Sequence, residues 1–292
     1  MKYIRLISYF LSVLIVTCVY SKNNKSINHL SDDFDDALSL EAWTNLSLKE
    51  GYPNKINIVD INKTKKRHLY IKPKESIWFE GYHGTFLYKE VSGDFVVSTK
   101  LSVSGVLEDF PDYPKKTWQI AGILVREPID VSVNKNKREE NWVFNTYGSG
   151  ISRKHLIDIG TNQDNIYTCY PFTGKDGSIE LRIVRIDEYI ITLSKNQREN
   201  WVLRKIIKRT DFSQTLQVGI MTNSSGYHYP FAGNLKKDFS YFDYNSQLID
   251  IDNKPDLQVY IDYVYYKRPS IDKKQLTDII GDGNKILSYF ND

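Results

Sequence analysis

A short stretch of the sequence, IWFEGYHG at residues 77–84, concentrates side chains that can recognise a sugar. Flat aromatic rings stack on the apolar face of a pyranose, while planar polar groups such as a guanidinium hold its hydroxyl groups in fixed directions. Two later runs of apolar residues carry further groups of this kind. We therefore predict a ligand-binding site formed by Trp78, Tyr82, His83, Arg126, Trp142 and Asn145.

Each of these residues also has a purely structural interpretation. Trp78 and Trp142 suit a core as well as a groove, because tryptophan is highly buried on average. Arg126 could neutralise a carboxylate at the edge of a sheet, although its planar fork suits two-pronged contacts with a ligand. Trp142 and Asn145 have opposite parity in one strand, so they share a groove only if a bulge intervenes. His83 has no companion at the spacing of a zinc site.

A second candidate surface lies in EVSGDFVVSTKLSVSG, residues 90–105, which alternates strictly after a Ser-Gly-Asp turn. One face is apolar, and the other carries Ser98, Lys100, Ser102 and Ser104. A period of two is typical of a strand that is buried on one side. The hydroxyl-bearing face is either solvated or the floor on which a ligand binds, and we expect it to lie beneath the predicted sugar site.

Acidic residues gather near both ends of the β-rich region. Asp33 and Asp35 belong to an SDDFDD stretch that precedes the first strand, and Asp262 lies in the last strand. If the first and last strands pair, these carboxylates converge, and carboxylate and backbone oxygens are the ligands of Ca²⁺. We therefore predict a structural calcium site at Asp33, Asp35 and Asp262. A surface acid cluster, or acids that cap a helix, is the alternative.

The spacing of the acidic residues argues against an enzyme. Glucanases built on β-sandwiches place the acid and the nucleophile on one strand as Glu-x-Asp-x-Glu, because a period of two directs the carboxylates to one face. This chain has no such motif; Asp250 and Asp252 have the spacing but no accompanying Glu. Motifs of metalloproteases, serine hydrolases and phosphate-binding loops are also missing from the sequence. Catalysis by acids on separate strands stays open.

The elements that must position these residues are strands. Turn residues separate runs of alternating and β-branched residues, and no stretch between residues 31 and 269 keeps a helical period over three turns. Twelve strands are predicted, at 55–61, 68–72, 85–91, 94–106, 119–127, 141–147, 165–172, 178–186, 188–194, 200–207, 215–222 and 257–267. Such a series predicts an all-β sandwich or jelly roll of two antiparallel sheets over residues 31–269, followed by a partly helical tail at 270–292.

The N-terminus predicts export. Lys2 and Arg5 precede an apolar run that is too short to span a bilayer, which is typical of a signal peptide at residues 1–21, followed by a flexible tether at 22–30. Lipid attachment at Cys18 and an uncleaved anchor are the alternatives to cleavage after Ser21. The mature chain then keeps only Cys169 and has no predicted membrane span. The net charge of +3, with short basic runs in loops, indicates no nucleic-acid partner.

Several stretches taken together resemble a known family. They are SDDFDD with Trp43, SIWFEGYHGTFLYKEVSGDFVVSTKL, WQIAGILVRE, ENWVFN, IELRIVRIDEYIITLSKNQRENWVL, LQVGIMTN and VYIDYVYYKRP. Their order is similar to that of the regulation-of-enolase-type family of unknown function, which belongs to the concanavalin A-like lectin/glucanase superfamily. The similarity covers about residues 31–268. It implies a jelly roll of two curved sheets, fits a structural calcium near both chain ends, and implies no particular chemistry.

From these features we predict an exported, lectin-like protein that binds an oligosaccharide or polysaccharide without cleaving it. Two other functions stay open. One is a glycoside hydrolase or polysaccharide lyase with dispersed acidic residues, and the other is a structural module that docks to a partner protein. A groove lined by aromatic rings favours sugar binding, two opposed carboxylates favour an enzyme, and a flat or occluded outer sheet favours docking.

Overall fold

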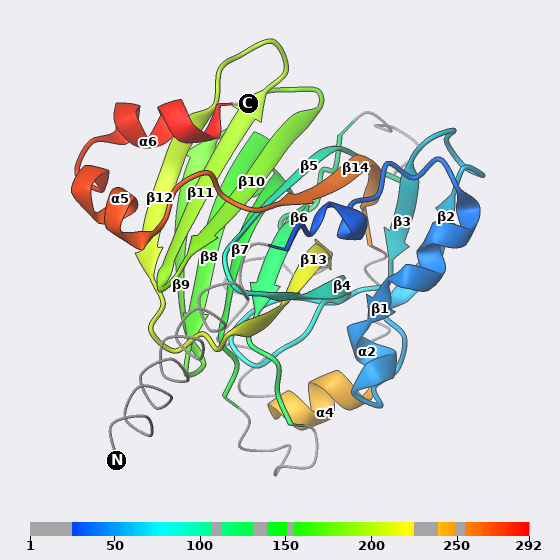
Figure 1. Ribbon diagram of the computed structural model, residues 1–292. Helices are drawn as coiled ribbons and strands as arrows, with labels where there is room; N and C mark the ends of the chain where they lie inside the picture. The colour runs from blue at the N-terminus through cyan, green and yellow to red at the C-terminus, as the bar shows by residue number, and fades with distance from the viewer. Residues whose placement is uncertain are drawn as a thin grey trace, which may run out of the picture.

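The computed structural model describes residues 25–106, 113–130, 139–150, 155–224, 239–248 and 255–291. In these residues two seven-stranded antiparallel sheets stack face to face (Figure 1). Sheet I, as we name it, has the strand order β1-β4-β13-β6-β7-β8-β9. Sheet II has the order β12-β11-β10-β5-β14-β3-β2. The prediction of an all-β sandwich of two antiparallel sheets is confirmed.

The strands observed agree closely with those predicted. Sheet I contains β1 (Thr44–Asn45), β4 (Thr85–Ser92), β13 (Thr215–Ser224), β6 (Gln119–Arg126), β7 (Trp142–Ser149), β8 (His155–Gln163) and β9 (Ile166–Thr173). Sheet II contains β12 (Val202–Lys208), β11 (Tyr189–Asn196), β10 (Ile179–Ile186), β5 (Phe95–Ser104), β14 (Gln258–Lys267), β3 (Leu69–Pro73) and β2 (Ile56–Ile61). Each of the twelve predicted strands has a counterpart whose ends differ by at most two residues. Strand β8 and the short β1 are additions.

The main core lies between the two sheets and follows from alternation along the strands. In β5, Phe95, Val97 and Leu101 point inward and are almost completely buried, as the sequence pattern predicts. Their neighbours in the sequence point to the outer face of sheet II. Each large apolar side chain buried in this way contributes about 1.5–3 kcal/mol relative to an exposed one.

The outer face of sheet I is covered by segments that connect strands. Residues 74–84 lead from β3 in sheet II to β4 in sheet I. Helix α2 (Leu46–Lys49) places Leu46 in an apolar cluster with the rings of this face. Helix α4 (Tyr241–Ser246) begins at Ser240, whose side chain accepts from the backbone N–H of Asp243, and packs Tyr244 against Tyr82. Two short 3₁₀ helices, η1 (Asn28–Leu30) and η2 (Ala37–Ala42), precede β1.

The C-terminal tail covers part of the outer face of sheet II. Helices α5 (Lys273–Ile279) and α6 (Gly283–Phe290) lie beside β10, β11 and β12 (Figure 1). Asp272 begins α5 with a capping box. Leu276, Ile286 and Phe290 are buried against the sheet. The helical tail expected from the sequence is therefore present, and it buries its apolar side chains against the sheet.

Parts of the N-terminal prediction concern residues 1–24, which lie outside the described residues. These include the signal peptide and Cys18. Asp250 and Asp252 also lie outside them. In the part of the chain that the structure describes, no helix combines the length and the apolar character needed to span a membrane.

Candidate functional site

The predicted site lies on the outer face of sheet I, where residues 74–84 fold over the strands. Trp78, Tyr82 and His83 come from this segment, Arg126 ends β6, and Trp142 begins β7. The structure thus brings together five of the six predicted side chains. It also buries all five, each with no more than 3% of its surface exposed.

The aromatic rings of this site pack against one another. The Trp78 ring stacks on His83 at a centroid distance of 5.2 Å and meets the Trp142 ring edge-on at 6.1 Å. Trp142 also stacks on Phe144 at 5.2 Å. Both indole N–H groups are satisfied by backbone carbonyls, since Trp78 donates to the carbonyl of Thr85 and Trp142 to that of Glu80. These ring faces serve the fold and are closed to a sugar.

One glycine makes the close packing of Trp78 possible. A Cβ atom at Gly84 would lie 2.5 Å from the carbonyl oxygen of Thr222 and 2.6 Å from Cδ1 of the Trp78 ring. Both distances are shorter than real Cβ contacts allow. The GYHG sequence therefore serves close packing rather than ligand access.

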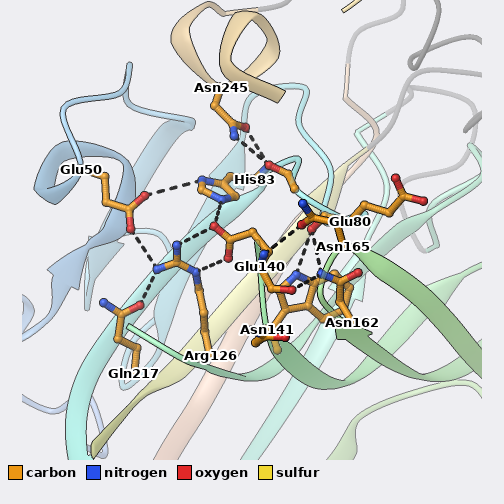
Figure 2. Close-up of polar contacts among 12 residues, drawn as sticks. Glu50, Glu80, His83, Arg126, Glu140, Asn141, Asn162, Asn165, Gln217 and Asn245 are labelled. Atoms are coloured by element: carbon orange, nitrogen blue, oxygen red, sulfur yellow. Dashed lines mark hydrogen bonds and ion pairs between the residues drawn. The ribbon is translucent and has the colours of Figure 1, made fainter. Parts of the chain in front are cut away.

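A single guanidinium, that of Arg126, binds two buried carboxylates (Figure 2). Its Nε and Nη2 donate to Oε2 and Oε1 of Glu140 at 2.7 and 2.8 Å. Its Nη1 donates to Oε1 of Gln217 at 2.7 Å and lies 3.0 Å from Oε1 of Glu50. His83 Nε2 lies 2.7 Å from Glu140 Oε1, and because an ionised carboxylate only accepts, this nitrogen carries the proton.

Burial and charge act in opposite directions on these groups. Burial alone would raise the pKa of Glu140, but the charge of Arg126, together with His83 and the hydrogen bonds that both residues donate, holds the pKa well below its usual range. Burial lowers the pKa of His83, so the imidazole is neutral at neutral pH. Burial also lowers the pKa of Lys55, whose Nζ donates to the carbonyl of His83 at 2.7 Å, to about 7. The ionised pair of Arg126 and Glu140 is therefore stable over the physiological pH range.

Asn145 is the one predicted residue that lies elsewhere. It points from β7 into the space between the sheets, where its amide donates to the carbonyls of Arg182 and Leu193 in sheet II at 3.1 and 2.8 Å. The opposite parity of Trp142 and Asn145 is thus real, and no bulge in β7 brings them to one face. The assignment of Asn145 to a groove is wrong, because this amide satisfies backbone groups across the core.

The exposed groove that the sequence predicts is likewise absent at these side chains. Tyr82 donates its hydroxyl to the carbonyl of Phe239, and its ring packs against Tyr241 and Tyr244. Arg126 follows its structural interpretation and pairs with carboxylates. Sequence reasoning missed both partners, Glu50 and Glu140, because no spacing in the chain links residues so far apart.

The three acidic residues of the predicted calcium site do lie near one another. The hydrogen bond that Arg67 donates to Asp35 is the largest cause that raises the pKa of Arg67, and the charges of Asp35, Asp33 and Asp262 raise it further. Arg67 Nε donates to Asp35 at 2.6 Å, and Lys100 Nζ pairs with Asp262 at 2.7 Å. Within the described residues, no three acidic, histidine or cysteine side chains form a group that could hold a metal. Two of the three predicted calcium ligands, Asp35 and Asp262, are therefore paired with basic side chains.

The hydroxyl-bearing face of β5 also lies away from the predicted site. Ser98, Lys100, Ser102 and Ser104 are on the outer face of sheet II, whereas Trp78, Arg126 and Trp142 belong to sheet I. The expectation that these hydroxyls floor the sugar site is wrong. A strand pattern fixes the faces of a strand but does not tell which sheet it joins.

A second group of polar side chains lies on the same outer face of sheet I, on strands β8 and β9. The Tyr167 hydroxyl lies 3.5 Å from Oδ2 of Asp158, and Oδ1 has no hydrogen-bond partner in the part of the chain that the structure describes. Burial raises the pKa of Asp158 to about 7. Cys169, on β9, is an exposed free cysteine, and desolvation raises the pKa of its thiol. A raised pKa lowers the thiolate fraction and so disfavours nucleophilic chemistry at this cysteine.

Two antiparallel seven-stranded sheets stacked face to face, with connecting segments folded over one outer face, define a jelly-roll β-sandwich. No family model matches the sequence, and no curated protein matches it. The chain is similar in structure to a functionally unknown protein from Saccharomyces cerevisiae, with a TM-score of 0.50 at 15% identity, over 79% of this chain and 98% of that one. The regulation-of-enolase-type resemblance is not supported by a family match.

Two further similar structures are much larger proteins. A GH43 protein, BlXynB, from Bacillus licheniformis has a TM-score of 0.51 at 12% identity. A protein described as Bacteroides ovatus Xyloglucan PUL GH43B has a TM-score of 0.51 at 13% identity. In both cases the match covers 82% of this chain and 39% of the other. The chain thus spans about two fifths of their length, and the likeness concerns the fold.

Proposed function

We propose that this chain is an exported, non-catalytic carbohydrate-binding protein. The observation that carries the non-catalytic part is the engagement of Glu50 and Glu140 by one guanidinium, that of Arg126. A glycosidase needs one carboxyl group that can donate a proton and a second that is free to act as base or nucleophile. Glu140 holds no proton, because its pKa lies well below the usual range. Both of its carboxylate oxygens accept hydrogen bonds from Arg126.

The carbohydrate part of the proposal rests on the fold and on surface chemistry. The sandwich is similar to parts of two GH43 proteins, one of which carries xyloglucan in its description. Export follows from the charged and apolar N-terminal residues. Because the face around Trp78 is closed, binding must use another surface of the molecule.

A direct test separates binding from cleavage. The full chain, expressed in a secreting host, is applied to a glycan array and to immobilised plant and microbial polysaccharides. The same polysaccharides are assayed for new reducing ends and for unsaturated products. We expect retention on at least one glycan without any product. Release of products would make the protein an enzyme.

The closed face of sheet I favours a second candidate, a structural module that docks to a partner protein. The aromatic rings and charged groups of this face contact other residues of the same chain and are buried, as in a packed interior. Docking would use edges and exposed apolar side chains such as Ile166 on the edge strand β9, which is 71% exposed. If no glycan is retained in the array, this second function replaces the first.

A further inference from the structure

The outer face of sheet II is covered over one half and open over the other. The tail helices bury Val96, Val184 and Ile191 on β5, β10 and β11. Farther along β5, and on the neighbouring β14, the outward side chains are partly exposed. We call this open area the tyrosine face; it consists of Tyr260, Tyr263, Tyr265, Lys100, Ser102 and Ser104.

A bulge in β14 creates the tyrosine face. The register against β5 shifts between Ile261 and Tyr263, so that Asp262 is an extra residue. Without it, Tyr260 would point to the opposite side of the sheet from Tyr263 and Tyr265, since side chains alternate along a strand. The bulge therefore turns all three rings outward, while Val264 and Tyr266 still point into the core.

Small side chains on β5 leave room around these rings. Tyr260 pairs with Ser102, Tyr263 with Lys100, and Tyr265 with Ser98 in the register of the two strands. A serine is too short to cover a tyrosine ring beside it. Tyr265 is accordingly 47% exposed.

The rings are held in fixed positions. Tyr263 and Tyr265 stack at a centroid distance of 4.3 Å and an interplanar angle of 10°. The Tyr263 hydroxyl donates to Glu180 at 2.9 Å. On the other side, Tyr260 packs against Tyr70 at 5.3 Å, and Tyr70 donates to Gln258 at 2.7 Å. Ordered rings lose little entropy when a ligand stacks on them, which favours affinity.

Several charges on this face are balanced by near neighbours, and Lys65 adds a cation whose Nζ lies 5.3 Å from the centroid of the Tyr260 ring. Lys100 pairs with Asp262 at 2.7 Å, and Lys195 with Glu180 at 2.7 Å. At the end of the face beside Tyr265, Asp35 is paired with Arg67. Such a surface attracts neither an anionic nor a cationic polymer strongly, but its carboxylates and hydroxyls can bond the hydroxyl groups of an uncharged one.

We propose that the tyrosine face binds an uncharged polysaccharide chain, with a sugar ring on the exposed side of Tyr265 and its hydroxyl groups held by the neighbouring carboxylates. This inference rests on the proposed carbohydrate-binding function and adds where the ligand binds and what charge it carries. The Asp residues that the sequence suggests for calcium acquire a different role here, beside an exposed ring.

Two variants test the site directly. Tyr265→Ala removes the exposed ring, and Ser102→Arg keeps every ring but fills the space beside Tyr260. A matched control is Tyr289→Ala on α6, because Tyr289 is 43% exposed and belongs to the tail. Binding of the full-length chains is measured against xyloglucan, galactomannan and β-1,3-glucan as uncharged probes, and polygalacturonate as an anionic probe. Thermal unfolding verifies that each variant is folded.

We expect wild type and Tyr289→Ala to bind at least one uncharged probe equally well, and Tyr265→Ala and Ser102→Arg to bind it at least tenfold more weakly. If all four proteins bind equally, the tyrosine face is not the site, although the proposed function stands. If wild type binds only polygalacturonate, the assignment of an uncharged ligand is wrong. If wild type binds no probe and no glycan on the array, the proposed function itself fails.

Discussion

The closed face of sheet I and the tyrosine face of sheet II both carry aromatic rings beside charged side chains, yet they differ in how far the rings are exposed. On sheet I, the rings of Trp78 and Trp142 and the guanidinium of Arg126 are all buried. On sheet II, the tyrosines of β14 rise above short serines, and Tyr265 is half exposed. Residue type therefore does not decide function here; what lies over each sheet does.

The coverings differ for a physical reason. The segment at residues 74–84 must cross the outer face of sheet I on its way to β4, and it carries apolar rings that gain free energy when buried. The tail packs on sheet II as two short helices, and its buried apolar residues contact β10, β11 and β12. Nothing in the described part of the tail covers β14.

The largest expected difference between the two faces concerns stability, and it is tested by removing the positive charge of Arg126 from the closed face. Arg126→Met would leave Glu50 and Glu140 buried without their shared cation, which costs about 3–5 kcal/mol of unfolding free energy. Urea denaturation measures the loss. Arg67→Met is the matched control, because its ion pair with Asp35 is exposed to solvent and contributes little to stability. Equal losses in the two variants would contradict the view that the two faces differ.

Much of the fold was predictable from local sequence. Alternation in β5 fixes which residues enter the core, and turn residues separate the strands. Strand β8 escaped prediction because Asp158, Gly160 and Asn162 interrupt its apolar pattern. These residues point to the outer face of sheet I, where Asp158 is buried with polar atoms that a strand pattern does not anticipate.

The site was predictable only in part. The sequence brings Trp78, His83 and Arg126 to attention, and the structure places them together. It does not reveal the pairing of Arg126 with Glu140, because no spacing motif links the two residues across the loop that separates them. It also does not reveal that a connecting segment closes the face, since exposure depends on tertiary packing. The bulge at Asp262 could not be predicted from the sequence either. A residue is extra only relative to its partner strand, and the sequence of one strand does not give the register of the pair.

The boundary between the covered and the open half of sheet II can be tested through the tail. Leu276 of α5 is fully buried against the sheet. Leu276→Ala should lower the unfolding free energy by about 2–3 kcal/mol, because it removes buried methyl groups and leaves a cavity. Glycan affinity should stay unchanged while the protein is folded. A loss of affinity together with stability would mean that the tail takes part in binding.

A titration sharpens the description of the closed face. Burial raises the pKa of Asp158 to about 7, above the value near 4 of the unfolded chain. Since the native state then holds a proton that the unfolded chain releases, the contribution of this group to stability falls as pH rises from about 4 to 7. Asp158→Asn should match wild type near pH 4 and exceed it at pH 8 by about 4 kcal/mol, since each pKa unit corresponds to about 1.4 kcal/mol. A difference between the two proteins that does not change with pH would contradict burial of this carboxyl.

The smallest stability change belongs to the residue with the largest expected effect on binding. Tyr265→Ala removes an exposed ring and its stacking on Tyr263, so the unfolding free energy should fall by only about 0.5 kcal/mol. Tyr82→Ala on the closed face removes the same side chain from a buried site and should cost about 3–5 kcal/mol. Chemical denaturation measures the stability of both variants, and a glycan-binding assay measures the affinity of both. If the two faces have the roles inferred here, Tyr82→Ala lowers mainly the stability and Tyr265→Ala lowers mainly the glycan affinity. The reason is that a ring buried by packing has no exposed surface on which a ligand can stack.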